Sequence, residues 1–187
     1  NLNTLSAKAN ALIELDSNRD VTAMVLTSDS IVQPIIFTDL DGTLLNHRDY
    51  NTDAVDTLLQ ELQYSGVPVV FNTSKTFSEV VALQQALNIT QPFIVENGSA
   101  VYIPKNYFNL RPIGCSEYQG YWCYSFAAPI SNLWTDLKRL KKDFGDQYSL
   151  FSELTSEQVM KMTGLNQLQA TQAQTRQYSD PLYWHGD

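Results

Sequence analysis

The sequence predicts an α/β protein whose core is a Rossmann-like, doubly wound parallel sheet. Three apolar stretches of strand length, at residues 35–40, 67–72 and 92–97, are separated by two stretches with helical spacing of apolar residues. Strands that are apolar on both faces suit a parallel sheet that helices cover on both sides. The alternation of strand and helix indicates right-handed crossovers, which bring the carboxyl ends of the strands to one edge of the sheet.

Two helices are expected to connect these strands. Thr52 can cap the first helix at its amino end, and Gly66 can end it. The second helix is expected to begin at Thr73 or Ser74, and residues 98–104 are expected to continue the sheet as a hairpin-like strand. The side chains that form the predicted buried face of the first helix are Val55, Leu58, Leu59 and Leu62.

The composition restricts the class of partner. The 187 residues carry a formal net charge of −8, and the isoelectric point is near 4.6. Nucleic acids and anionic membranes bind through Lys and Arg, so neither is expected as a partner. Cys115 and Cys123 match neither a zinc motif nor a disulfide framework, which indicates free thiols in the cytoplasm. Neither a membrane-spanning segment nor a signal peptide is expected.

The chain is expected to consist of three parts. Residues 1–33 form an N-terminal extension of unknown role. Residues 34–104 form the first part of the core. From residue 105 the sequence becomes aromatic and rich in turn residues, so residues 105–187 are predicted to form a smaller α/β unit inserted after the third strand. Its helical patterns occur at residues 130–145, 155–165 and 166–180, and the last of these is expected to run into a strand at residues 181–187.

Two carboxylates follow the first apolar strand, in the sequence DLDGTLL. A single Asp there would most simply open an Asx-turn or cap a helix. The pair Asp39 and Asp41 instead suits phosphoryl transfer. One carboxylate can be the nucleophile, while the other protonates the leaving alcohol and then deprotonates water. Backbone N–H groups from Leu40 to Gly42 can cradle phosphate oxygens, and Gly42 permits a tight turn beside them.

Polar side chains also end the second and third strands, at Thr73 and Asn97. Ligands of doubly wound sheets bind at the carboxyl ends of the strands, so these side chains are expected to lie near Asp39. Clustered acids that face an anionic substrate imply a hard cation, and Mg²⁺ suits oxygen ligands. Thr73 could equally be a helix N-cap, and the two roles are compatible because a helix N-terminus attracts anions.

The stretch DLDGTLL resembles the first motif of the haloacid dehalogenase superfamily of phosphatases. The resemblance implies that Asp39 is the nucleophile and Asp41 the general acid/base. It also implies that the Asp39 carboxylate and the Asp41 backbone carbonyl bind Mg²⁺, and that Thr73 is the phosphate-binding hydroxyl of the second motif.

A narrower resemblance extends from about residue 35 to the last residue. The stretches VVFNTSKT, PFIVENGSAVYIP, LTSEQVMKMTGL and RQYSDPLYW are similar to motifs of the mannosyl-3-phosphoglycerate phosphatase family, in the same order. The departures are Asn72 and Thr73, where serine is commoner, and Asp180, which is one methylene shorter than the usual glutamate. The resemblance implies a cap domain of the α/β type. The further residues it places at the substrate are Ser74, Lys75, Asn97 and Gly98 from the core, and Arg176 and Ser179 from the cap.

Two of these residues have plainer interpretations when the sequence is considered alone. Arg176 would be a solvated cation at a helix end. Lys75 would be an ordinary residue in the first turn of a helix, where a cation is slightly unfavourable next to the helix dipole. A bound phosphate would make a cation at that position easier to understand.

These features predict a Mg²⁺-dependent phosphatase that hydrolyses a glycosyl-3-phosphoglycerate, mannosyl or glucosyl, through an aspartyl-phosphate. That activity would serve synthesis of a compatible solute such as mannosylglycerate, and the partner would be a small sugar phosphate. The alternatives are a phosphatase for another sugar phosphate and a non-catalytic ligand-binding fragment. The superfamily's later lysine and G-D-x-x-x-D motifs cannot be placed after the cap motifs, so the chain is expected to end within the cap and to have little activity alone.

Overall fold

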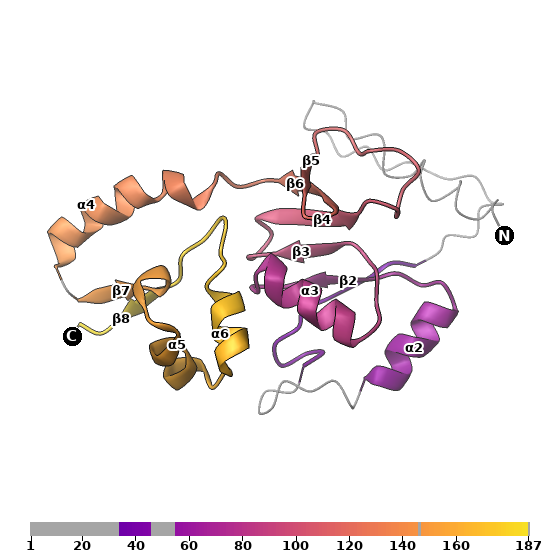
Figure 1. The fold of residues 1–187 in the computed structure, drawn as a ribbon, viewed down its shortest axis with the longest axis horizontal. Coiled ribbons are helices and arrows are strands. Elements are labelled where there is room, and N and C mark those ends of the chain that lie inside the picture. The colour runs from indigo at the N-terminus through magenta and orange to yellow at the C-terminus, as the bar shows by residue number, and fades with distance from the viewer. Residues whose placement is uncertain (1–33, 46–54, 146, 187) are drawn as a thin grey trace.

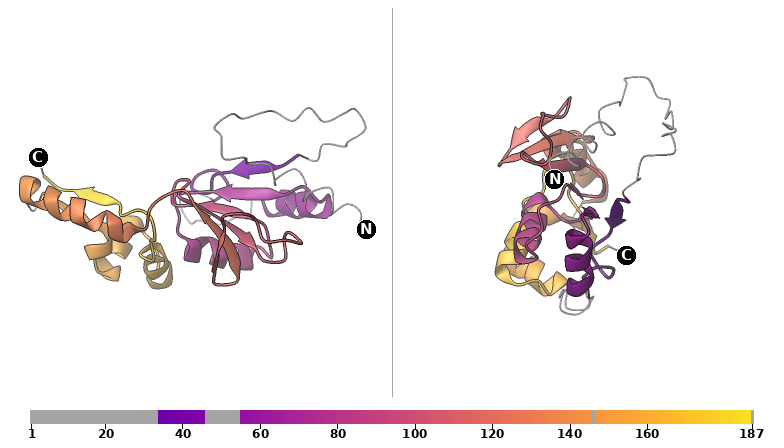
Figure 2. Two further views of the ribbon diagram at one scale, coloured as in Figure 1. Left: turned by 90° about the horizontal axis from the view of Figure 1, so that it is seen from above. Right: turned by 90° about the vertical axis from the view of Figure 1, so that its right-hand side faces the viewer.

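The structure is a computed structural model that describes residues 34–45, 55–145 and 147–186. The described elements form two lobes, which lie next to each other along the long axis of the molecule (Figures 1 and 2). One lobe is built on a six-stranded sheet, and the other on a two-stranded sheet. Among the described residues, no helix has the length and apolar character needed to cross a membrane.

The large sheet is mixed, with parallel strands at one side and antiparallel strands at the other. Its first three strands are parallel, which confirms the predicted core, and the strand expected at residues 98–104 is present and antiparallel to its neighbour. In spatial order the strands are β1 (Ile36–Thr38), β2 (Val69–Asn72), β3 (Phe93–Val95), β4 (Ala100–Pro104), β6 (Tyr121–Ser125) and β5 (Ser116–Tyr118).

The register of the parallel strands brings their carboxyl ends together. Thr38 of β1 lies opposite Phe71 of β2, and Phe71 lies opposite Phe93 of β3. Beyond the strands, the Thr73 N–H donates to the Ile94 carbonyl over 3.1 Å. The residues that follow these three strands therefore emerge along one edge of the sheet, where doubly wound folds bind their ligands.

The hairpin of β6 and β5 extends this sheet past residue 104, where the first part of the core is expected to end. The sequence predicts no strand for residues 116–125, but β6 pairs along its whole length with β4. The rings of Tyr118 and Tyr121 lie edge-on to Phe77, with centroids 5.0 and 5.3 Å away. Strand pairing and ring packing thus join the hairpin to the core, and the chain leaves the sheet at Ser125 rather than at residue 104.

Two helices, α2 (Asp56–Tyr64) and α3 (Phe77–Ala86), connect the parallel strands. The N-cap of α2 is Val55, which makes no side-chain cap, and the expected cap Thr52 lies outside the described residues. Leu59 is buried as predicted, whereas Leu58 is 55% exposed, so the predicted apolar face is too wide. Gly66 has a φ of 70° just after the helix, which agrees with its expected role in ending it.

Helix α3 begins later than the sequence predicts. Its N-cap is Thr76, not Thr73 or Ser74, and Thr76 forms a capping box with Glu79. The Thr76 hydroxyl accepts the Glu79 N–H over 3.3 Å, and the Glu79 carboxylate accepts the Thr76 N–H over 2.8 Å. Lys75 therefore precedes the helix and does not lie in its first turn, which removes the expected conflict with the helix dipole.

The second lobe, residues 130–186, contains helices in the three predicted regions and a short antiparallel sheet, but the third helix ends at Ala173 and does not extend to residue 180 as predicted. Helix α5 has the predicted capping box between Thr155 and Gln158. The strand expected at residues 181–187 is present as β8, but its partner β7 is not predicted from the sequence. The elements are η1 (Ile130–Asn132), α4 (Trp134–Phe144), β7 (Tyr148–Leu150), η2 (Phe151–Glu153), α5 (Ser156–Thr163), α6 (Gln167–Ala173) and β8 (Leu182–Trp184).

The two lobes touch where α6 and the loop after it approach the start of α3 (Figure 1). We call this loop, residues 174–181, the docking loop. The Thr76 hydroxyl donates to the Gln172 carbonyl over 2.9 Å, just before the loop begins. The Ile130 N–H, at the entrance to the second lobe, donates to the Gln177 carbonyl over 2.7 Å. The docking loop therefore leaves the second lobe, contacts the core, and returns to β8.

Candidate active site at the carboxyl ends of the parallel strands

The turn after β1 presents Asp39 to solvent while its neighbour anchors the chain. Asp39 is exposed, but the Leu40 side chain is completely buried. Gly42 has a φ of 74°, which permits the chain to reverse directly after the acidic pair. The Leu40 carbonyl accepts three N–H groups of the turn, from Thr43, Leu44 and Leu45. Leu40 can therefore reach a ligand only through its backbone, whereas Asp39 is open to an approaching substrate.

Asp41 is paired with a cation from the next strand end. The Lys75 ammonium lies 2.7 Å from Asp41 Oδ1, and the two side chains are 13% and 37% exposed, respectively. Because β1 and β2 are neighbours, the loops that follow them are brought within reach of each other. The arrangement puts a fixed positive charge next to the proposed proton donor, at the edge where the sequence predicts phosphate binding.

Thr73 joins the ends of β2 and β3. It is 2% exposed, and its carbonyl accepts the Asn97 N–H over 3.0 Å. Its hydroxyl oxygen accepts the Lys75 N–H over 3.2 Å, so that bond leaves the hydroxyl hydrogen unused. Thr73 is therefore not the helix N-cap, and its hydroxyl fixes the turn that carries Ser74 and Lys75.

The turn after β3 has an unusual backbone. Glu96, Asn97 and Gly98 have successive φ values of 48°, 59° and 89°, all in the left-handed region. Non-glycine residues rarely adopt this conformation, and such strain concentrates at functional sites. Asn97 and Gly98 are exposed, but Glu96 is 2% exposed.

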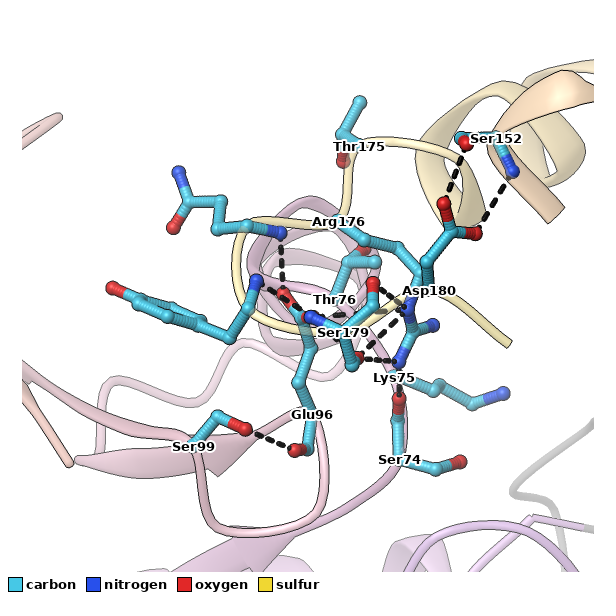
Figure 3. Close-up of polar contacts among 12 residues, drawn as sticks. Ser74, Lys75, Thr76, Glu96, Ser99, Ser152, Thr175, Arg176, Ser179 and Asp180 are labelled. Atoms are coloured by element: carbon cyan, nitrogen blue, oxygen red, sulfur yellow. Dashed lines mark hydrogen bonds and ion pairs between the residues drawn. The ribbon is translucent and has the colours of Figure 1, made fainter. Parts of the chain in front are cut away.

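The Glu96 carboxylate is held by the docking loop (Figure 3). One oxygen accepts the Gln177 N–H over 2.8 Å. The other accepts the N–H groups of Tyr178 and Ser179, over 3.1 and 2.9 Å, and the Ser179 hydroxyl over 2.6 Å. Successive N–H groups that converge on an anion form a nest, and four donors compensate the burial of this charge. Sequence reasoning does not find this role, although an acid that directly follows an apolar strand is a signal for it.

Arg176 and Ser179 are engaged in the same contact region. The Arg176 guanidinium donates to the Ser179 hydroxyl and, over 2.9 Å, to the Ser74 carbonyl of the core. Its Nε lies 3.7 Å from the Glu96 carboxylate, and its side chain is 10% exposed. It is therefore not a solvated cation at a helix end. In this arrangement Arg176 links the lobes, and its contact with a substrate remains an expectation.

The Asp180 carboxylate makes its hydrogen bonds within the second lobe. Its carboxylate accepts the Ser152 N–H over 3.0 Å and the Ser152 hydroxyl over 2.5 Å. The shorter side chain at this position thus orders the docking loop against η2. Figure 3 shows Asp180 turned toward Ser152, away from Glu96 and Ser74.

The oxygen donors at the end of β1 fit one kind of Mg²⁺ site, in which the protein supplies only a few of the ligands. Within the described residues, no three His, Cys, Asp or Glu side chains gather into a metal-holding group. Mg²⁺ in phosphoryl-transfer sites is commonly held by one or two carboxylates, while waters and phosphate oxygens complete its shell. Asp39 and the Asp41 carbonyl suit that arrangement, whereas a metal enclosed by protein ligands alone would not fit.

Comparisons with known proteins agree with this geometry. Residues 36–113 match the family model described as haloacid dehalogenase-like hydrolase. A glucosyl-3-phosphoglycerate/mannosyl-3-phosphoglycerate phosphatase of Persephonella marina is 37% identical over 150 residues, which cover 79% of this chain and 54% of the relative. A mannosyl-3-phosphoglycerate phosphatase of Pyrococcus furiosus is 35% identical over 149 residues, which cover 80% and 60%. The chain therefore spans little more than half the length of these relatives.

A solved phosphatase of the haloalkanoate superfamily from Bacteroides thetaiotaomicron shares 17% identity at a TM-score of 0.49, covering 76% of this chain and 51% of that one. The family match includes all three parallel strands and the turns that carry Asp39, Thr73 and Asn97. Residues 36–113 are therefore similar to haloacid dehalogenase-like hydrolases, and over about 150 residues the chain is similar to mannosyl-3-phosphoglycerate phosphatases.

Proposed function

We propose that this chain carries the nucleophile and the proton donor of a phosphatase acting on a glycosyl-3-phosphoglycerate. The observation that carries the proposal is the pairing of Asp41 with Lys75, 2.7 Å apart, beside an exposed Asp39. A domain kept only for ligand binding has no need of an open carboxylate and, two residues on, a second carboxylate set against a cation.

The proposed reaction has two steps. An Asp39 carboxylate oxygen attacks phosphorus, the bond between phosphorus and the C3 oxygen of the glycerate breaks, and Asp41 gives its proton to that oxygen as it leaves. Water then attacks the phosphorus of the aspartyl-phosphate, Asp41 accepts a proton from the water, and the bond to the Asp39 oxygen breaks as inorganic phosphate is released. The Lys75 ammonium would attract the anionic substrate and stabilise charge on the transferring group.

Three further groups would hold the phosphate. The Thr73 hydroxyl hydrogen can donate to a phosphate oxygen, because its bond to Lys75 uses only the oxygen. Backbone N–H groups of the turn from Leu40 to Gly42 supply fixed dipoles without a net charge. Mg²⁺, held by the Asp39 carboxylate and the Asp41 carbonyl, would neutralise the phosphate charge.

The substrate class follows from the relatives and from the position of the second lobe. Both relatives are named as phosphatases of a glycosyl-3-phosphoglycerate. We propose that the second lobe is the cap that closes over the sugar, since its docking loop reaches the site edge at Ser74 and Glu96. The net charge of −8 does not favour nucleic acid. Cys115 and Cys123 are free and buried, which suits the cytoplasm.

A panel of phosphate esters tests the proposal. Release of inorganic phosphate would be measured with Mg²⁺ from mannosyl- and glucosyl-3-phosphoglycerate, from sucrose and trehalose phosphates, and from glucose 6-phosphate. We expect the two glycerate esters to be preferred. A clear preference for simple hexose phosphates would overturn the glycerate assignment. Binding of the esters without phosphate release would favour a ligand-binding function instead.

A further inference from the structure

The contact between the docking loop and the core has one organising group, the Glu96 carboxylate. It is 2% exposed and accepts four hydrogen bonds, all from residues 177–179. Its partners are more than 80 residues away along the chain, so the contact exists only in the folded arrangement of the two lobes. None of these bonds reaches Asp39 or Asp41, so the carboxylate is not placed to contact a reacting phosphate.

The same contact region also holds the loop that carries Lys75. Three successive residues of that loop, residues 74–76, each make a hydrogen bond to a residue of the contact region. The Ser74 carbonyl accepts from the Arg176 guanidinium over 2.9 Å, and the Lys75 carbonyl accepts the Glu96 N–H over 3.0 Å. The Thr76 hydroxyl donates to the Gln172 carbonyl over 2.9 Å. The Arg176 guanidinium and the Glu96 N–H thus hold two adjacent carbonyls. These are the carbonyl just before Lys75 and the carbonyl of Lys75 itself.

We propose that Glu96 is a positioning residue that fixes Lys75 against Asp41 by latching the docking loop onto the core. The carboxylate collects the N–H groups of residues 177–179, and this places Arg176 over the Ser74 carbonyl. With Ser74 and Lys75 held from the side of the second lobe, the Lys75 side chain is directed toward the end of β1. Arg176 and Ser179 then act through this latch, which deepens the proposed function by giving the second lobe control over a group at the site.

A purely structural role for Glu96 predicts something different. Loss of the carboxylate would then lower overall stability and leave the geometry around Lys75 unchanged in the molecules that remain folded. The latch predicts a local effect at two separate places, the docking loop and the loop at residues 73–76, with little change elsewhere. Both effects are measurable without turnover, so the test does not depend on whether the chain is an active phosphatase.

Two measurements on the whole chain separate these possibilities. The first is backbone amide exchange followed by mass spectrometry, over peptides covering residues 73–76 and 174–181. The second is the rate at which a pulse of amine-acetylating reagent modifies Lys75 relative to the exposed Lys138 of α4. The test variant is Glu96→Gln, whose amide sets an NH₂ group against N–H donors. Ser179→Ala is the milder variant, because it removes one 2.6 Å donor and leaves the carboxylate in place.

Two control variants are matched to the test variant. Glu157→Gln makes the same chemical change at an exposed position in the first turn of α5. Thr155→Ala removes the N-cap of α5 and lowers stability without deleting a hydrogen bond to the docking loop, because among the described residues the Thr155 hydroxyl bonds only to the Gln158 N–H. Neither variant alters a residue placed at the site, so both report what a charge change or a loss of stability does by itself.

We expect Glu96→Gln to raise amide exchange by about tenfold in both peptides and to raise Lys75 acetylation severalfold, with Ser179→Ala intermediate. Neither control should change the Lys75 ratio. If exchange rises in the docking loop while Lys75 acetylation stays at the wild-type ratio, the latch does not position Lys75 and the proposal is wrong. An equal rise of Lys75 acetylation in Thr155→Ala would also overturn it. If Glu96→Gln does not fold, Ser179→Ala decides by the same two criteria.

Discussion

The Lys75 ammonium lies 2.7 Å from the Asp41 carboxylate, and the two residues follow neighbouring parallel strands. This pairing is the meeting point of three features of the fold. The register of β1 and β2 brings together the loops that follow these two strands. The late start of α3 leaves Lys75 in the loop after β2. The docking loop is hydrogen-bonded to that same loop through Arg176. A cation fixed in this way next to the proposed proton donor would stabilise an anionic substrate.

Replacement of Asp39 by Asn should abolish phosphate release while the fold is kept. The amide has nearly the shape of the carboxylate but is a poor nucleophile, and Asp39 is exposed, so its loss costs little stability. We expect activity to fall by at least about a thousandfold, with an unchanged circular dichroism spectrum. Asp143→Asn, at an exposed position of α4, is the matched control. A variant that kept a tenth of the activity would exclude the aspartyl-phosphate.

Replacement of Asp41 by Asn should be more damaging for poor leaving groups than for good ones. The C3 alkoxide of the glycerate needs a proton to leave, whereas nitrophenolate does not, so loss of the acid should affect the glycerate ester more. The ratio of rates for a glycosyl-3-phosphoglycerate and p-nitrophenyl phosphate measures this. Lys75→Met serves as the comparison, because it removes the cation from the pair and should slow both substrates alike. The same loss for both substrates in Asp41→Asn would argue against a proton donor.

The positions of the strand ends could be predicted from the sequence because they depend on local patterns. Apolar runs of strand length ended by Asp39, Thr73 and Asn97 identify three strands, and the crossover rule places their ends on one edge. The capping box of Thr155 and Gln158 is equally local, and the structure has it. Each of these predictions depends on residues fewer than ten positions apart.

Contacts between distant segments could not be predicted in this way. The start of α3 is misplaced because three hydroxyl residues, Thr73, Ser74 and Thr76, compete as N-caps, and burial of Thr76 against the second lobe favours the last. The β6–β5 hairpin is hidden by its aromatic, turn-rich sequence and depends on packing against Phe77. Nothing in the local pattern of Glu96 indicates that its partners lie at residues 177–179.

The ion pair between Lys141 of α4 and Glu153 of η2 should make stability depend on pH. The Lys141 ammonium lies 2.7 Å from the carboxylate, and its hydrogen bond lowers the pKa of Glu153. A lowered pKa in the folded state gives stability that is present above the unfolded value of about 4.3 and is lost as the pH falls through the folded value. Both side chains are more than a third exposed, so the contribution should be under about 1 kcal/mol.

Urea unfolding of Lys141→Met at a series of pH values measures this contribution. The variant should be less stable than the wild type at pH 7, and the difference should shrink as the pH falls below about 4. Lys142→Met, at the next position of the same helix, should show no such convergence. A difference that stayed constant down to pH 3 would mean that lost packing of the Lys141 stem, and not the ion pair, is responsible.

Two threonines in similar capping boxes provide the last prediction, a measure of how strongly the lobes are joined. The hydroxyls of Thr76, at the start of α3, and Thr155, at the start of α5, each accept the N–H of the residue three positions later over 3.3 Å. The backbone N–H of each threonine donates to the side-chain oxygen of that same residue over 2.8 Å. They differ in surroundings. Thr76 is completely buried and its hydroxyl also donates toward the Gln172 carbonyl of the second lobe, whereas Thr155 is exposed.

Replacement of Thr155 by Ala should therefore cost only the cap, about 1 kcal/mol of unfolding free energy. Thr76→Ala should cost the cap and also remove the hydrogen bond between the lobes to the Gln172 carbonyl, which adds about 1 kcal/mol. Thr76→Ser keeps the hydroxyl and should restore most of the loss. Equilibrium urea unfolding of the three variants and the wild type measures these differences. Equal costs for Thr76→Ala and Thr155→Ala would show that the bond to Gln172 contributes nothing to joining the lobes, because the two caps are otherwise matched in geometry.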